Sequence, residues 1–244
     1  MNTLLVIIPT YNEIDNIHSI LSAVLILPLD AHILVVDDGS PDGTAQVVHK
    51  MKESYFERIH LIERTSKSGL GTAYIAGFKW ALERNYSFIA EMDADFSHPP
   101  EKLLDLYQCC NSGMADLAIG SRYIKGGGVI NWPKSRLALS KGASAYVRLI
   151  TGMHVMDPTA GFVCYARKVL EKINLDHIEF IGYAFQIEMK YAAHLLGFKM
   201  KEIPITFPDR IKGKSKMNIY IIREALIGVI YMKFFKSKKE YSLA

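Results

Sequence analysis

The sequence lacks any apolar run long enough to cross a membrane, since a spanning helix needs roughly 18 to 20 such residues. The longest candidate, residues 225–232, is flanked by Arg223, Glu224 and Lys233. The apolar start of the chain has neither a basic leader nor a small-residue cleavage site. We therefore expect residues 1–8 to form a first strand rather than a signal peptide.

The sequence also has few cysteines and a small net charge. The three cysteines among 244 residues are not spaced as metal ligands, and an odd number cannot all pair in disulfides. We therefore expect buried thiols in a reducing, cytoplasmic setting. The net charge is only +4, and lysine and arginine concentrate in the C-terminal third. This asymmetry indicates an anionic partner, and because no nucleic-acid motif is present, it favours phosphate or a membrane surface over nucleic acid.

Two common nucleotide-binding motifs are absent as well. Gly69-Leu70-Gly71 would need a third glycine at position 74 to form a dinucleotide fingerprint, and Tyr74 stands there. Gly213-Lys214-Ser215 resembles the end of a phosphate-binding loop, but Pro208 occupies the place of the first glycine of that loop. We therefore expect neither an NAD-type cofactor nor a nucleotide held by such a loop.

The sequence does contain a regular alternation of strand and helix patterns. We expect helices between successive strands, and strands near residues 4–8, 33–36, 59–62, 88–92, 117–119 and 203–207. The alternation predicts an α/β fold, a single domain in which a mostly parallel sheet has helices on both faces. We assign residues 1–217 to this domain and residues 218–244 to a C-terminal amphipathic helix with a basic tail.

Polar residues follow the predicted strands at their carboxyl ends, which is where ligands bind in open α/β sheets. Asp93 and Asp95 stand one residue apart after a buried strand, so they could converge on one hard cation such as Mg²⁺ or Mn²⁺. Asp38 is placed to accept hydrogen bonds from a ribose, and Tyr11 and Glu13 could bracket a base.

Some of these positions also fit a purely structural role. Asp37-Asp38-Gly39-Ser40 is typical of an Asx-turn, and Tyr11 could be an aromatic residue at the edge of the core. His98 could reach a metal held by the acidic pair, but the following Pro99-Pro100 favours a turn residue. The residues alone leave these alternatives open.

Longer motifs give these positions a common context. Four segments resemble the family-2 glycosyltransferases of GT-A fold: Pro9-Thr10-Tyr11-Asn12-Glu13, Asp37-Asp38-Gly39-Ser40-Pro41-Asp42-Gly43-Thr44, Gly69-Leu70-Gly71-Thr72-Ala73-Tyr74 and Met92-Asp93-Ala94-Asp95. Four more narrow the resemblance to the dolichol-phosphate (polyprenol-phosphate) mannosyltransferases: Gly120-Ser121-Arg122-Tyr123, Asp157-Pro158-Thr159-Ala160-Gly161-Phe162, Gly182-Tyr183-Ala184-Phe185-Gln186-Ile187-Glu188-Met189 and Asp209-Arg210-x-x-Gly213-x-Ser215-Lys216.

The resemblance implies inverting transfer of mannose from GDP-mannose to polyprenyl phosphate, which gives polyprenyl-phosphate mannose and GDP. It implies that the nucleotide sugar is bound by Pro9, Tyr11, Glu13, Val36, Asp38, Asp93, Ala94, Asp95, Arg122, Arg210 and Lys216. It implies that Mg²⁺ or Mn²⁺ is held by Asp93 and Asp95, and that the acceptor phosphate is bound by Arg122, Arg136 and Ser140. Asp95, Arg122 and Arg136 would then act in catalysis.

Ser97 and Glu188 bear on the metal shell and on the question of a catalytic base. Ser97 stands where some members of the family have a glutamine metal ligand, which leaves room for water in the metal's coordination shell. Because a phosphate monoester is already ionised near neutral pH, we assign no catalytic base. Glu188, on an apolar helix, is instead expected to anchor a buried basic partner.

A lipid acceptor also implies a peripheral place on the cytoplasmic face of a membrane, and some members of the family use a small membrane partner protein. The helix at 218–235 suits either docking on the bilayer or packing on the core. Two other activities stay open. One is a polyprenyl-phosphate glucosyltransferase that uses UDP-glucose. The other, from a different class, is a sugar-nucleotide pyrophosphorylase, although Tyr11-Asn12-Glu13 stands where that class usually has a glycine- and lysine-rich loop.

Overall fold

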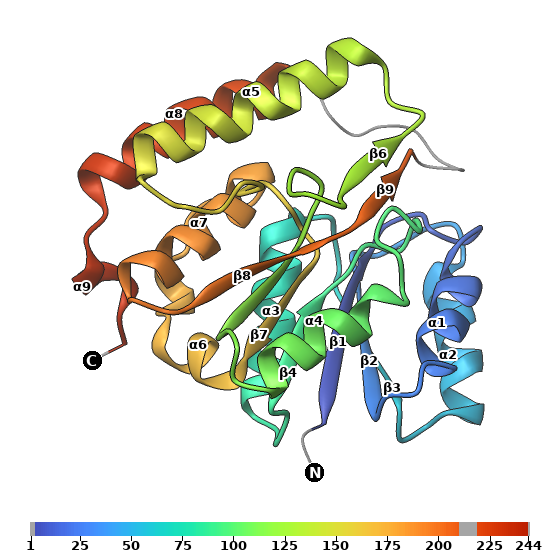
Figure 1. Cartoon of the computed structure of the whole chain (residues 1–244). Helices are drawn as coiled ribbons and strands as arrows, with labels where there is room; N and C mark the ends of the chain where they lie inside the picture. Colours follow the sequence, from blue (N-terminus) through green and yellow to red (C-terminus); the bar gives the residue numbers. More distant parts are fainter. Residues whose placement is uncertain (1–2, 210–218, 244) are drawn as a thin grey trace.

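The computed structural model describes residues 3–209 and 219–243, and its main feature is a seven-stranded sheet in the order β3-β2-β1-β4-β7-β5-β8 (Figure 1). The strands are β1 (Leu4–Thr10), β2 (Ala31–Asp37), β3 (Ile59–Glu63), β4 (Phe88–Glu91), β5 (Leu117–Ser121), β7 (Val163–Ala166) and β8 (Met200–Pro204). Strand β7 runs antiparallel to both of its neighbours, β4 and β5, and the other pairs are parallel. The predicted mostly parallel sheet is thereby confirmed.

A second, two-stranded sheet lies beyond β5 and β8. It consists of β6 (Gly128–Ile130) and β9 (Thr206–Pro208), which pair in parallel. The prediction of one strand at 203–207 was therefore wrong in detail, because the chain changes partners at Ile205, whose N–H donates to the carbonyl of Ser121 at 3.0 Å. This change of partner carries Phe207 and Asp209 to the carboxyl ends of the main strands.

The helices cover both faces of the main sheet (Figure 1). They are α1 (Ile17–Leu25), α2 (Thr44–Ser54), α3 (Leu70–Leu82), α4 (Lys102–Asn111), α5 (Lys134–Thr151), α6 (Arg167–Lys172), α7 (Tyr183–Leu195), α8 (Ile219–Phe235) and α9 (Lys238–Tyr241), with a short 3₁₀ helix η1 (Leu175–His177) before α7.

The alternation of side chains along β1 shows why the sheet is covered on both sides. Leu4, Val6 and Ile8 belong to the hydrophobic cluster under α1, α2 and α4, whereas Leu5 and Ile7 belong to the cluster under α3 and α7. Successive side chains of a strand point to opposite faces, so an uninterrupted apolar strand needs cover on both.

Helices α5 and α8 lie side by side over α7 (Figure 1), and the hydroxyl of Tyr146 on α5 donates to the carbonyl of Leu226 on α8 at 2.8 Å. Val229 and Met232 of α8 and Tyr241 of α9 are fully buried, so the C-terminal helices pack on the body. The predicted boundary at residue 217 falls among residues that the structure does not describe. No helix in the described residues is long and apolar enough to span a bilayer.

Candidate active site

A cavity of about 700 Å³ lies between the carboxyl ends of the parallel strands and helices α5 and α7. The predicted site residues that line it are Pro9, Tyr11, Glu13, Asp38, Asp93, Ala94, Asp95, Arg122, Arg136 and Ser140. Val36 does not line it, because its side chain is fully buried in the core. Arg210 and Lys216 lie outside the described residues. Side chains from four strands and a helix thus meet at one edge of the sheet.

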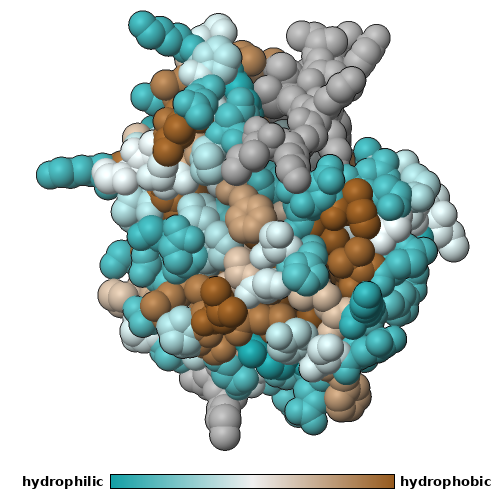
Figure 2. Space-filling model, turned by 90° about the vertical axis from the view of Figure 1, so that its right-hand side faces the viewer, coloured by the Kyte–Doolittle hydropathy of each residue, from teal (hydrophilic) through white to brown (hydrophobic). Residues whose placement is uncertain are grey.

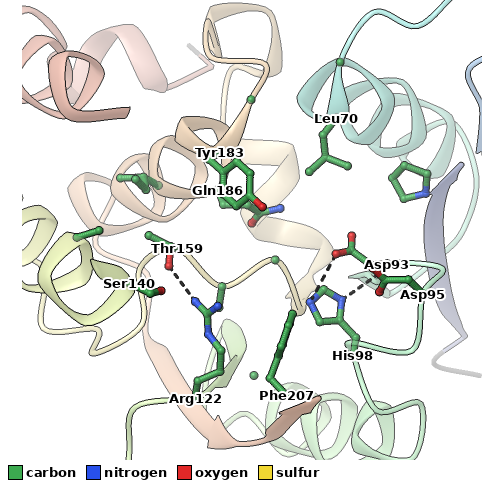
Figure 3. A pocket seen from close by; sticks show the side chains of 18 of the residues that line it. Leu70, Asp93, Asp95, His98, Arg122, Ser140, Thr159, Tyr183, Gln186 and Phe207 are labelled. Atoms are coloured by element: carbon green, nitrogen blue, oxygen red, sulfur yellow. Dashed lines mark hydrogen bonds and ion pairs between the residues drawn. The ribbon is translucent and has the colours of Figure 1, made fainter. Parts of the chain in front are cut away.

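The acidic pair follows β4 in a loop that buried side chains hold in place (Figure 3). The N–H of Asp93 donates to Nδ1 of His98 at 2.9 Å, and Nε2 of His98 lies 4.0 Å from Oδ2 of Asp93. Ser97 donates both its N–H, at 3.0 Å, and its hydroxyl to Oδ1 of Asp95. His98 is therefore more than a turn residue, since it fixes the backbone and faces the carboxylate of Asp93.

Two residues beside the cavity have a backbone conformation that is uncommon for residues with a Cβ atom. Asn12 has φ of 58° and Phe96, between the acidic pair and Ser97, has φ of 60°. Asparagine tolerates this left-handed region, but a bulky side chain such as Phe96 is strained there. Strain of this kind is typical of functional sites, where the surrounding structure holds the residue in place.

The donor set at this loop fits a hard divalent cation. Asp93 and Asp95 both line the cavity, and carboxylate oxygen is a ligand that Mg²⁺ and Mn²⁺ prefer. Ions of this type commonly take one or two carboxylates from the protein and complete the coordination shell with phosphate and water. The serine at position 97 is engaged with Asp95, which agrees with a two-carboxylate site.

The next acidic pair, at the end of β2, divides into a structural and a cavity residue. Asp37 accepts hydrogen bonds from the hydroxyl of Thr10 at 2.7 Å and the N–H of Ser40 at 2.8 Å, which is the predicted Asx-turn. Asp38 lines the cavity and accepts from Nε of Arg64 at 2.7 Å. The arginine fixes the orientation of this carboxylate, whose role toward a ribose stays a prediction.

Arg122, at the end of β5, is held rigidly inside the cavity wall. Its Nε and Nη2 each lie 2.7 Å from one oxygen of the fully buried Asp157, and Nη2 also donates to the hydroxyl of Thr159 at 2.9 Å. Burial lowers the pKa of the guanidinium, but the hydrogen bonds and charge of Asp157 outweigh it and raise the pKa above its usual value. Three of the five N–H groups are used in this way, and among residues 3–209 and 219–243 no hydrogen-bond acceptor lies at the two on Nη1.

Arg136 and Ser140 stand one helical turn apart on α5 and face the same cavity. Nη1 of Arg136 donates to Asp209 at 2.7 Å, and its guanidinium stacks on the Trp132 ring at 3.8 Å from the centroid. The hydroxyl of Tyr123 donates to Ser140 at 2.6 Å. Two arginines and a serine therefore line the part of the cavity next to α5.

Glu188 was expected to anchor a buried basic partner, but its direct hydrogen-bond donors are neutral groups. Its carboxylate is fully buried, but it accepts from the N–H groups of Glu179 and Phe180, both at 2.9 Å, and from the hydroxyl of Tyr241 at 3.1 Å. Burial raises its pKa despite these donors. Glu188 thus ties the segment before α7 to α9, and the largely buried Lys236, which pairs with Glu179, adds a positive charge that acts to lower the pKa of Glu188.

Gly71, from the short glycine motif, has a packing role. A Cβ atom there would lie 2.8 Å from the carbonyl of Phe180 and 2.9 Å from the ring of Phe185. Helix α3 therefore approaches the start of α7 too closely for a side chain, which explains a glycine in the absence of a dinucleotide site.

Several residues in and behind the cavity have partners in distant segments, so their roles could not be predicted from the sequence. Asp157, Thr159 and Gln186 belong to motifs of the family, but nothing in their spacing links the first two to Arg122 or the third to Glu91 and Lys190. His98 follows the acidic pair closely and could reach a metal, but Pro99-Pro100 favours a turn residue instead. The lining residues Trp132 and Phe207 follow from the β6–β9 sheet, which was not predicted.

The sequence matches the family described as glycosyl transferase family 2 over residues 5–174, and the chain belongs to this family. Among curated relatives, a polyprenol monophosphomannose synthase of Mycolicibacterium smegmatis is 51% identical, with 92% of this chain and 84% of that protein covered. An undecaprenyl-phosphate mannosyltransferase of Micrococcus luteus is 44% identical, with 92% and 91% covered.

Solved structures share the fold at much lower identity. Glucosyl-3-phosphoglycerate synthase of Mycobacterium tuberculosis, in complex with Mn²⁺, UDP and its glucosylated product, has a TM-score of 0.69 at 15% identity, covering 95% of this chain and 80% of that one. A mannosyltransferase of Pyrobaculum calidifontis in complex with GDP-Man and Mn²⁺ has a TM-score of 0.58 at 15% identity, covering 96% and 70%. The predicted GT-A fold is confirmed.

Proposed function

We propose that the protein transfers mannose, with inversion, from GDP-mannose to a polyprenyl phosphate and releases GDP. The observation that carries this proposal is the cavity itself, which runs from the acidic pair to Arg136 and Ser140 and continues along apolar side chains. Those side chains are Leu139, Ala143 and Val147 of α5, Ile187 of α7 and Leu226 of α8. A donor diphosphate, an acceptor phosphate and a hydrocarbon chain each find a matching region. The two curated relatives are named for mannose and polyprenol-type acceptors.

At the donor end, Asp93 and Asp95 would hold Mg²⁺ or Mn²⁺, which when bound neutralises charge on the departing GDP. Tyr11, Glu13 and Asp38 would contact the nucleoside, together with Pro9 and Ala94, whereas the buried Val36 is dropped from this set. Arg210 and Lys216, outside the described residues, belong to this proposal as further donor contacts. Nζ of Lys67 lies 4.6 Å from the centroid of the Tyr11 ring, and this cation–π contact helps to hold the ring beside the donor region.

At the acceptor end, the phosphate is the nucleophile and is ionised before it binds, so no base has to remove a proton. The chain's task is to bring two anions together. Nη1 of Arg122 and the guanidinium of Arg136 would bind the acceptor phosphate by charge-assisted hydrogen bonds, and Ser140 would add a hydroxyl. Asp157 holds Arg122 in one orientation, so little side-chain freedom is lost when the phosphate binds.

The lipid also requires contact with a membrane, and we assign that contact to α8. Six apolar residues are exposed in its described part: Leu226, Ile227, Ile230, Tyr231, Phe234 and Phe235. The face seen in Figure 2, by contrast, has hydrophobic side chains in separate groups among hydrophilic ones. An exposed apolar row of this kind suits the bilayer interface, with lysines after it attracted to anionic lipid. We place the protein on the cytoplasmic face of the membrane, alone or with a small membrane partner protein.

A donor comparison tests this function. Purified protein with polyprenyl phosphate and Mn²⁺ is given radiolabelled GDP-mannose or UDP-glucose, and lipid-soluble label is counted. We expect labelled lipid from GDP-mannose at least about 100-fold faster, because a pocket that hydrogen-bonds the correct base and sugar leaves groups unpaired with the wrong donor. Faster transfer from UDP-glucose would make the protein a glucosyltransferase instead. Membership of a glycosyltransferase family argues against the pyrophosphorylase alternative, because a pyrophosphorylase transfers a nucleotidyl group and not a sugar.

A further inference from the structure

Two fully buried charged residues lie behind the cavity, and neither is explained by the acceptor or metal contacts. Glu91 is the last residue of β4 and Lys190 lies in the middle of α7, both at 0% exposure. Charged side chains are almost never fully buried unless they are paired. The residue that lies between them, Gln186 of α7, lines the cavity.

The hydrogen bonds of this group are complete on the side away from the cavity. Nζ of Lys190 donates to the carbonyl of Ala160 at 2.6 Å, the carbonyl of Gln186 at 3.0 Å and Oε1 of Gln186 at 3.1 Å. Oε2 of Glu91 accepts from Nε2 of Gln186 at 2.8 Å, and Oε1 accepts from the hydroxyl of Tyr165 at 3.4 Å. All three ammonium hydrogens and both carboxylate oxygens are therefore engaged.

This pattern fixes the orientation of the Gln186 amide. An ammonium group can only donate, so Oε1 must face Lys190, and this orientation turns Nε2 toward Glu91. Burial raises the pKa of Glu91 and lowers that of Lys190, and the charge of each opposes the shift of the other. Because neither side chain has a solvent-facing alternative, the amide cannot flip without losing both bonds.

One amide hydrogen remains. Nε2 of Gln186 carries two, Glu91 takes one, and the described residues provide no acceptor for the other. In the view of Figure 3, the Gln186 side chain lies between Arg122 and Thr159 on one side and Asp93 on the other. The remaining N–H thus belongs to a part of the cavity between the two places proposed for phosphates.

We propose that Gln186 donates this N–H to a hydroxyl of the donor's hexose, and that Lys190 and Glu91 are positioning residues that aim it. The inference rests on the proposed function and adds how the sugar is recognised. A neutral amide suits a neutral hydroxyl, whereas the charged side chains of the cavity suit phosphates. A buried donor built to meet a hydroxyl also rejects a sugar that lacks it, because the donor is then left unpaired.

The test pairs variants of Gln186 with GDP-mannose analogues that each lack one hydroxyl. For the wild-type protein, we expect one of these analogues to lower kcat/KM about 10- to 100-fold, as leaving one buried donor unpaired would. Gln186→Leu should lower kcat/KM for GDP-mannose by a similar factor. For this variant, kcat/KM with the sensitive analogue should equal kcat/KM with GDP-mannose. Calorimetry with GDP alone should give an unchanged affinity. If Gln186→Leu discriminates among the analogues as the wild type does, or loses GDP affinity equally, the inference is wrong.

The positioning role needs a separate comparison. Lys190→Met should raise KM for GDP-mannose and weaken discrimination against the sensitive analogue, with GDP affinity unchanged; Lys79→Met, at an exposed lysine, should change neither. A purely structural Lys190 would lower the melting temperature without affecting discrimination, which would overturn this part. Gln186→Asn replaces Gln186→Leu if the latter does not fold. If the wild-type protein does not use GDP-mannose, the proposed function is wrong. Gln186 is then tested with deoxy analogues of the donor that the protein does use.

Discussion

At the scale of single residues, the surroundings of a carboxylate separate two kinds of role. Asp95 lines the cavity and is oriented by Ser97, so it is placed to bind something from outside the chain. Asp157 is fully buried and accepts three hydrogen bonds from Arg122, two from its side chain and one from its backbone N–H. The first residue should therefore be needed for activity, and the second for both stability and activity.

Replacing Asp95 by asparagine should remove metal-assisted transfer without unfolding the protein. The amide keeps the shape of the side chain but not its charge, so Mn²⁺ affinity and turnover should both fall, turnover by about 100-fold or more. Mn²⁺ binding measured by electron paramagnetic resonance, together with a melting curve, checks this. Asp105→Asn, at a half-exposed carboxylate on α4, is the control. Wild-type turnover by Asp95→Asn at saturating metal would contradict a metal role.

Replacing Asp157 by asparagine should destabilise the fold strongly, because it leaves the buried guanidinium of Arg122 without its counter-charge. Breaking a buried ion pair from one side costs roughly 3 to 5 kcal/mol. The matched control is Asp209→Asn, which breaks the partly exposed pair with Arg136 and should cost about 1 kcal/mol or less. Urea unfolding of both variants gives the two free energies. Equal costs would mean that Asp157 does not hold Arg122 as the geometry indicates.

Much of the cavity could be predicted because the ends of buried strands can be recognised in the sequence. Asp93 and Asp95 follow an apolar strand directly, and parallel strands place such residues at a shared edge. Asp157 and Gln186 could not be assigned, because their roles depend on contacts with residues 35 and 95 positions away. The hydrogen-bond partners of Glu188 could not be predicted for the same reason, since the hydroxyl of Tyr241 that donates to it comes from α9.

At the scale of elements, the sequence left open whether α8 packs on the core or docks on a membrane, and the helix has a face suited to each. Val229 and Met232 are buried, and a Cβ atom on Gly228 would lie 2.6 Å from the Phe180 ring, so one face packs closely on the body. On the other face Phe234 and Phe235 are 73% and 68% exposed. Core packing and membrane docking are thus compatible on opposite faces of one helix.

Polar substitution on the exposed face should release the protein from membranes and leave its stability unchanged. We expect Phe234→Ser with Phe235→Ser to lower binding to anionic vesicles by about 10-fold or more, since burying an aromatic side chain contributes on the order of 2 kcal/mol. High salt should weaken binding of the intact chain by screening its lysines. Co-sedimentation measures both effects. Phe56→Ser, exposed after α2, is the control, and an equal loss there would show that α8 has no special role.

Removing residues 218–244 should unfold the protein instead of simply detaching it. The deletion exposes the core around Val229, Met232 and Tyr241 and takes away a donor to Glu188. A melting curve of the truncated chain should therefore lie far below that of the full chain. A truncated protein that keeps the wild-type melting temperature would mean that the C-terminal helices add nothing to the core.

At the scale of the whole molecule, the alternation of strands and helices was enough to predict the layers. It could not predict that β7 runs antiparallel between β4 and β5, because a four-residue apolar strand is compatible with either direction. Nor could it predict the β6–β9 sheet, whose strands are three residues long and meet across the fold. Both features shape the cavity near Arg122 and Arg136.

In the proposed function, one cavity joins a mannosyl donor to a lipid phosphate. The most direct test is to incubate the purified protein with GDP-mannose, Mn²⁺ and undecaprenyl phosphate, and to identify the product by mass spectrometry and NMR. We predict mannosyl phosphoryl lipid with the inverted, β configuration, and no product when phosphoglycerate replaces the lipid. An α-linked product, or mannose transferred to phosphoglycerate while the lipid phosphate stays unmodified, would contradict the account.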